Sequence, residues 1–195
     1  MKNIILFISL FSFTVAASQD VEKNIASARS AYEAGKLEDA RSAMEQVLRE
    51  LDIAIGKEII ALLPAKIGPY SAVAGEEGVH LAGSGLGLML GRQYGTEAKG
   101  VRVDIANNSP LLGGLNSLLA LPVFGAGNPD QKQVKVQGYK ALLTRTAEEN
   151  GKQNYSLQIP FGNNLLTMNA ADATEADVLN YAAALPMSKI AAVTQ

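Results

Sequence analysis

The amino-acid sequence predicts an α+β fold, in which an N-terminal helical hairpin is followed by a largely antiparallel sheet covered by helices. Up to Pro64, apolar residues recur at helical spacing. Beyond Ala65, short segments alternate apolar and polar residues, and their links are too short for the crossovers that parallel strands need. We therefore divide the 195 residues into a leader (1–17), a helical hairpin (18–64) and an α+β antiparallel-sheet domain (65–195).

The first residues have the pattern of a secretory signal peptide. Lys2 is followed by an apolar segment from Ile4 to Val15 and by two small residues, Ala16 and Ala17. This segment is shorter than the roughly 20 apolar residues that span a bilayer. We expect cleavage after Ala17 and export to the periplasm.

The composition excludes several classes of protein. The chain has no cysteine, which excludes disulfides, thiolate metal sites and a lipidated cysteine, so we expect no lipid anchor. The formal net charge of −2 argues against nucleic-acid binding, which needs a basic surface. No segment after the leader is long and apolar enough to cross a membrane, and no motif indicates a cofactor or a metal.

Two helices are predicted before Pro64. The first carries apolar residues from Val21 to Tyr32 and ends near Gly35, because glycine suits a helix C-terminus. The second begins near Leu37 and is ended by Pro64. Glu45 and Arg49, four residues apart, are expected to pair on its surface.

The segment "ASARSAYEAGKLEDARSAMEQVL" resembles one tetratricopeptide-type helix pair. The resemblance lies in small and apolar residues at the helix crossing and the turn, namely Ala28, Gly35, Leu37, Ala40 and Met44. An array of such repeats needs about three copies to close its core, and one is present. We therefore favour a hairpin packed on its own domain over a repeat-style peptide groove.

The second part of the chain predicts strands, one internal helix and a C-terminal helix. Leu86–Tyr94 and Gly100–Asn108 form a hairpin, and Asn108 or Ser109 caps a helix from Pro110 to Leu121. A capping box at Asp172–Glu175 opens a helix that Pro186 ends, before one more short turn. The remaining strands are Lys132–Gly138, Tyr139–Ala147, Asn154–Gly162 and Asn164–Ala170.

This order of elements, from Ile67 to Ala192, is similar to that of small exported bacterial domains of the Mog1/PsbP-like architecture. The resemblance implies an antiparallel sheet covered by helices. It carries no function across, because one fold supports many functions.

The segment from His80 to Gly95 is rich in glycine but matches neither phosphate-binding motif. The spacing of its glycines does not fit the dinucleotide fingerprint, and Gly91 is followed by Arg92 rather than by lysine. In a strand, Gly83, Gly85, Gly87 and Gly91 share one face. We predict that a helix packs closely on this bare face, and the alternative is a ligand groove.

His80, the single histidine of the chain, follows Glu76 and Glu77. A carboxylate beside an imidazole can serve acid–base chemistry, but a zinc site needs at least three protein ligands. We interpret this segment as an exposed acidic turn that flanks a strand, and we assign no catalytic residue.

Arg92, Arg102 and Asp104 alternate with apolar residues on two paired strands, where they can form cross-strand ion pairs. The alternative is a binding role, for which Arg92, Tyr94 and Arg102 are the candidate ligand-binding residues. The sequence predicts an exported, non-catalytic binding or envelope-interaction protein, with another envelope protein or a small ligand as partner. The alternative is a metal-independent enzyme that uses carboxylates, Tyr94 or His80. The oligomeric state and the ligand stay open.

Overall fold

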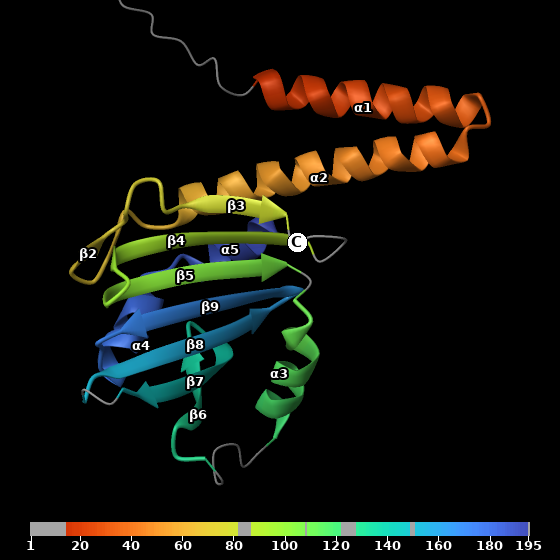
Figure 1. The fold of residues 1–195 in the computed structure, drawn as a ribbon. Coiled ribbons are helices and arrows are strands. Elements are labelled where there is room, and N and C mark those ends of the chain that lie inside the picture. The colour runs from red at the N-terminus through yellow and green to blue at the C-terminus, as the bar shows by residue number, and fades with distance from the viewer. Residues whose placement is uncertain (1–14, 82–86, 108, 122–127, 149–150, 195) are drawn as a thin grey trace, which may run out of the picture. The chain divides into compact units, whose positions relative to one another are not determined.

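The computed structural model describes residues 15–81, 87–107, 109–121, 128–148 and 151–194. The predicted α+β class is confirmed, and the elements are shown in Figure 1. The chain divides into two compact units, one up to Ala54 and the other from Ile55 to the C-terminus. The division falls inside the second helix, before the predicted boundary at Pro64, because the last turns of that helix belong to the core of the sheet unit. Of the helices in the described residues, none combines the length and apolarity needed to cross a membrane.

The hairpin consists of helices α1 (Val15–Glu33) and α2 (Leu37–Leu62). Gly35 ends α1 with a φ of 75°, and the backbone amide of Lys36 donates to the carbonyl of Ala31 at 2.9 Å, as in a Schellman turn. The predicted pair of Glu45 and Arg49 is wrong. Arg41 reaches Glu45 at 3.0 Å instead, and Arg49 donates to Gln46.

The main sheet is antiparallel throughout, with the strand order β3-β4-β5-β9-β8-β7-β6. A separate two-stranded sheet pairs β1 (Lys66–Ile67) with β2 (Tyr70–Ser71). The strands of the main sheet are β3 (Gly78–Leu81), β4 (Leu88–Thr96), β5 (Lys99–Asn107), β6 (Gln131–Val136), β7 (Tyr139–Ala147), β8 (Gln153–Phe161) and β9 (Asn164–Ala171).

The turns of the sheet agree with the predicted hairpins. Strands β4 and β5 are joined by Glu97 and Ala98, a tighter link than the predicted one from Gly95 to Lys99. Gln137 and Gly138 both have positive φ, 48° and 90°, as a two-residue hairpin turn requires.

One face of the main sheet, here called the core face, carries the large hydrophobic core. The last turns of α2, together with α4 (Glu175–Ala183) and α5 (Met187–Val193), contribute to this core. Figure 1 shows α4 and α5 behind the strands. The predicted C-terminal turn is thus a seven-residue helix, whose Met187 and Ile190 are fully buried. Strand residues at every second position complete the core, among them Val101, Val103, Ile105, Leu157, Ile159, Leu166 and Met168.

The opposite face, here called the open face, is covered at one end by α3 (Leu111–Ala120), close to the predicted helix. A second, smaller core forms there from leucines of the helix and of strands β7 and β9. Its members are Leu112, Leu115, Leu119, Leu142 and Leu165.

Helix α4 begins with a capping box that is displaced by two residues from the predicted one. Thr174, not Asp172, is the N-cap: its hydroxyl accepts from the amide of Asp177, and the carboxylate of Asp177 accepts from the amide of Thr174 at 3.0 Å. Asp172 instead has a φ of 52° and lies at the end of β9. The displacement arises because β9 continues to Ala171.

The predicted helix on the glycine face is not found where the chain is described. Gly83 and Gly85 lie outside the described residues, and Gly87 has a φ of 79°, so β4 begins only at Leu88. At Gly91, an added Cβ would meet the side chains of Asp104 and Arg102 rather than a helix. A close approach between a helix and the sheet does occur at another glycine. In α2, a Cβ added to Gly56 would lie 2.5 Å from the side chain of Val79 in β3.

Candidate functional site: the open face of the sheet

A row of hydrogen-bonding side chains crosses five strands of the open face. Because Val101 and Val103 point into the core, Arg102 between them points to the open face. The register places Arg102 opposite Gln93 on one side and opposite Asn169 on the other, and the row continues through Ser156. We call this set the polar row; its members are Gln93, Arg102, Asn169, Ser156 and Thr144.

Beside the polar row, the sheet surface is hollowed because the adjacent residues are small. Gly100 and Ala171 lie opposite each other on β5 and β9. A cavity of about 410 Å³ lies over this region. Its walls include four members of the polar row together with Glu97, Thr146 and Asn154.

Arg102 is held in place by its neighbour on the same strand. Its Nε donates to both carboxylate oxygens of Asp104, at 3.0 and 3.2 Å, and its side chain is nearly half exposed. Burial raises the pKa of Asp104, while the Arg102 guanidinium opposes that rise. The guanidinium therefore lies at the cavity in a fixed orientation.

Amides and hydroxyls supply the remaining polar groups of the cavity. Asn154 is fixed by two hydrogen bonds: its Nδ2 donates to Glu148 at 2.7 Å, and its Oδ1 accepts from the amide of Asp172. In the described part of the chain, no hydrogen bond engages the side chains of Ser156, Asn169 and Thr146. These three groups are therefore free to bind a ligand.

The structure does not bring the three predicted binding residues together, because Arg92 and Tyr94 point to the core face and Arg102 to the open face. Tyr94 is completely buried, and its hydroxyl donates to the carbonyl of Pro64 at 2.9 Å. Burial raises the pKa of Tyr94, whereas the charge of Arg92 and its hydrogen bond lower it.

Arg92 joins two segments that precede the main strands. Its guanidinium contacts Glu77 at 2.6 Å and donates to the carbonyl of Leu63 at 2.9 Å, just after the end of α2. Its Nε is buried and has no hydrogen-bond partner among the described residues. Arg92 and Tyr94 therefore fasten the end of α2 to the sheet.

His80 lies on the short strand β3, opposite Met89, and its side chain is exposed. Glu76 and Glu77 precede this strand, and Glu77 is paired with Arg92. Within the described residues, no group of three or more histidine, cysteine, aspartate or glutamate side chains is arranged to hold a metal.

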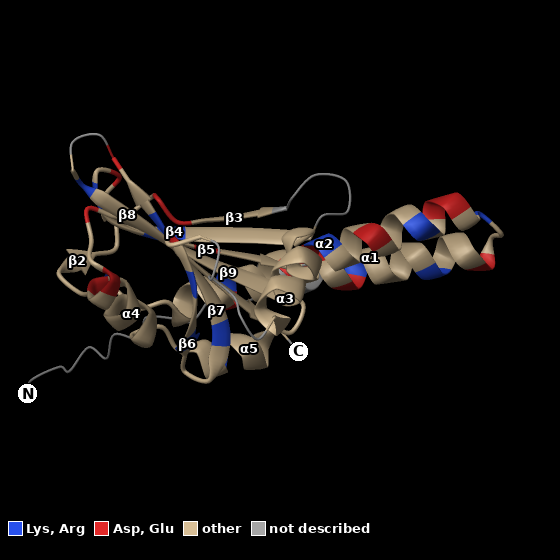
Figure 2. Cartoon of the chain, turned by 90° about the horizontal axis from the view of Figure 1, so that it is seen from below, with Lys and Arg blue, Asp and Glu red and all other residues tan. Residues whose placement is uncertain are grey.

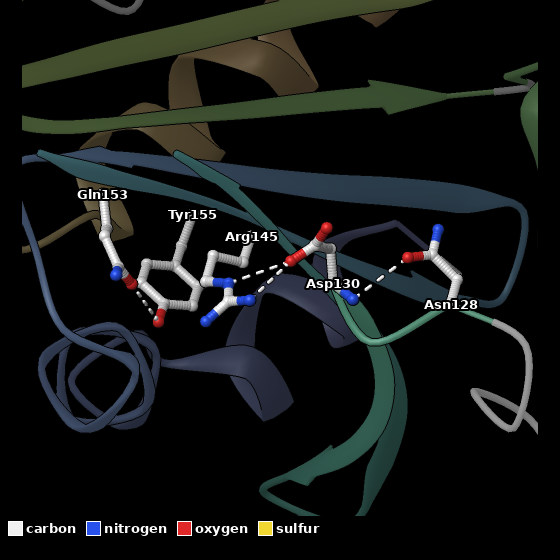
Figure 3. Close-up of polar contacts among 5 residues, drawn as sticks. All are labelled: Asn128, Asp130, Arg145, Gln153 and Tyr155. Atoms are coloured by element: carbon white, nitrogen blue, oxygen red, sulfur yellow. Dashed lines mark hydrogen bonds and ion pairs between the residues drawn. The ribbon is translucent and has the colours of Figure 1, made fainter. Parts of the chain in front are cut away.

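A second polar cluster lies on the core face, at the β6 side of the sheet (Figure 3). Arg145 pairs with Asp130 at 2.7 Å, and the hydroxyl of Tyr155 donates to Gln153 at 3.2 Å. The adjacent cavity measures about 100 Å³, and its charged side chains are paired, Arg145 with Asp130 and Lys132 with Glu175. A cavity of that size holds only a few waters, so the open face is the stronger candidate site.

Gln93, Asn169 and Ser156 were not among the residues predicted from the sequence. The alternation within each strand already indicates which of them avoid the core. Their juxtaposition depends on the pairing of β5 with β9, which no local pattern specifies.

No known protein-family model matches the sequence, and no curated protein is significantly similar to it.

Proposed function

We propose that the chain is an exported periplasmic binding protein that holds a small polar ligand in the cavity on the open face. The observation that carries this proposal is the polar row, whose Asn169 and Ser156 side chains are unengaged beside an oriented guanidinium. Export is supported by the N-terminal pattern of Lys2, the apolar segment and the two alanines.

The cavity walls indicate the chemistry of the ligand. The volume of the cavity lies within the range of about 300–1,000 Å³ that small-molecule sites occupy. Arg102 and Asn169 offer N–H donors, while the hydroxyls of Ser156 and Thr146 both donate and accept. These groups fit a ligand rich in oxygen acceptors, such as a polyhydroxylated compound or a hydroxy acid.

The test is a binding screen by amide chemical-shift mapping with monosaccharides, hydroxy acids and amino acids as probes. We expect shifts to concentrate on β5, β8 and β9 around the polar row, and we expect Arg102→Ala and Asn169→Ala each to weaken binding at least tenfold. Gln158→Ala is the matched control, because Gln158 lies on the same face two residues beyond Ser156 but does not line the cavity. Shifts located elsewhere, or equal affinity in all three variants, would contradict the proposal.

Two further measurements address catalysis and export. A panel of esterase, phosphatase, glycosidase and peptidase substrates should show no turnover. If the protein turned over one of them and His80→Ala abolished that activity, the proposed binding function would be wrong and the protein would be an enzyme. Mass spectrometry of protein from its native envelope should find an N-terminus at Ser18, or at Gln19 if cleavage falls one residue later. An intact Met1 on the exported protein would refute the signal peptide.

A further inference from the structure

The hairpin unit buries small side chains and leaves large ones in solvent. Its buried apolar residues are Ala28, Ala40 and Val47. Between them the helices form an apolar groove of about 460 Å³. Six large apolar side chains of this unit are 44–70% exposed: Ile25, Tyr32, Leu37, Met44, Leu48 and Leu51.

Four of these exposed residues, Leu37, Met44, Leu48 and Leu51, form a stripe along α2. Met44, Leu48 and Leu51 follow one another at intervals of four and three residues, and Leu37 lies seven residues before Met44. This is the spacing with which helices pack side by side in coiled coils and four-helix bundles. Packing of an apolar face supplies most of the stability of a protein helix, and the described residues of this unit do not cover that face.

We propose that this stripe binds the same stripe of a second copy of the chain, with the two α2 helices antiparallel. Two hairpins then form a four-helix bundle about a twofold axis, the commonest symmetry of protein oligomers. The axis passes between Gln46 and Val47, so that Met44 of one copy lies against Leu48 of the other. This inference is independent of the proposed ligand site on the sheet.

The charges along α2 select this arrangement. Both signs are interspersed along the hairpin (Figure 2). In the proposed pairing, Arg41 lies near Asp52 of the second copy, and Glu45 lies near Arg49 of the second copy. All four side chains flank or interrupt the apolar stripe, and Arg41 itself lines the groove. Each twofold-related contact occurs twice, so four opposite-charge contacts border the interface.

Other pairings of the same stripe bring like charges together. A parallel pair places Glu45 beside Glu45 and Arg41 beside Arg41. An antiparallel pair centred on Glu45 places Arg41 near Arg49 and Glu38 near Asp52. Like-charge contacts disfavour these two alternatives relative to the proposed register.

The first test is the molecular mass of the purified chain by analytical ultracentrifugation across a range of concentrations. We expect a dimer, and we expect Leu48→Lys to give a monomer at concentrations where the parent is dimeric. Leu111→Lys is the matched control, because Leu111 is 59% exposed on α3 while Leu48 is 57% exposed on α2. A monomeric parent, or a Leu48→Lys variant as dimeric as the parent, would overturn the proposal.

The second test uses charge reversal to verify the register. Arg41→Glu and Asp52→Arg should each raise the dissociation constant about tenfold, whereas a chain carrying both changes should dimerise nearly as well as the parent. A double variant weaker than either single one would exclude the antiparallel pairing proposed. Arg41 and Asp52 lie in the hairpin unit, so neither substitution should unfold the sheet unit. Circular dichroism of each variant checks that the fold is retained.

Discussion

The two faces of the main sheet are built from the same strands but serve different purposes. On the core face, residues such as Leu166 and Met168 are fully buried beneath helices. On the open face, α3 covers one end, and the other end presents the polar row beside a hollow formed by glycine and alanine. The core face therefore supplies most of the buried apolar packing of the sheet, and the proposed binding site lies on the open face.

Leu166→Ala should cause the largest loss of stability among the variants that test this difference. Leu166 is fully buried in the central strand β9, and removing a buried leucine side chain typically costs about 2–5 kcal/mol. Its neighbour Thr167 points to the open face, so Thr167→Ala should change stability by no more than about 0.5 kcal/mol. Urea denaturation of both variants measures the contrast, and equal losses would show that the open face contributes to the core.

Gly100→Ala should lower the stability of the protein, although it adds only one methyl group to the open face. An added Cβ would collide with the backbone oxygens of Tyr94 and Thr96, and such overpacking costs about 1–3 kcal/mol. Gly113→Ala in α3 is the control: nothing lies near its added Cβ, so the change should stabilise the helix by about 1 kcal/mol. Thermal denaturation of the two variants should therefore shift in opposite directions.

Thr174→Ala tests the attachment of α4 on the core face, with an expected loss of about 1 kcal/mol. Hydrogen bonds from Thr174 lower the pKa of Asp177. The contribution of Asp177 to the stability of the fold is therefore complete above about 3.9, the pKa of the carboxyl in the unfolded chain. It is lost as the pH falls through the lower pKa of the folded protein. Asp177→Asn should be less stable than the parent at pH 7, and this difference should shrink at pH 2.

Asp104→Asn should have the smallest effect and the opposite pH dependence. Burial raises the pKa of Asp104 in the folded protein. Its contribution to stability is therefore most favourable below the pKa of the unfolded chain, and it is lost as the pH rises through the higher pKa of the folded protein. The asparagine variant should therefore match or exceed the parent in stability at pH 7, with the advantage vanishing near pH 3. A variant clearly less stable at neutral pH would show that the ion pair with Arg102 dominates the cost of burial.

The sequence allowed most of the elements to be predicted, because each depends on local patterns. The α2 helix ends near Pro64 as predicted, and the turns at Gly138 and Gly162 divide the strands where glycine was expected. Of the glycines predicted to share a strand, Gly91 lies in β4, but Gly87 was wrongly placed, because a period of two does not reveal its positive φ; Gly83 and Gly85 lie outside the described residues.

The candidate site was predictable only in part, although one overlooked signal lay within a single strand. Leu88 and Leu90 share a face with Arg92 and Tyr94 at period two, which places the latter pair in the core. Arg102 alone among the predicted residues reaches the cavity. Its neighbours across the sheet could not be identified, because Asn169 approaches Arg102 through a pairing between distant strands.

The strand order also has a consequence for the rate of folding. Strands β3–β5 form one local meander and β6–β9 form another, and within the main sheet the strand pairing between them is that of β5 with β9. This pairing closes a long loop, since it joins Asn107 to Asn164, and long-range contacts of this kind slow folding. We therefore expect each meander to form early and their union to limit the rate. Arg102 and Asn169 meet only at that final step, so ligand binding should report on completion of the native sheet.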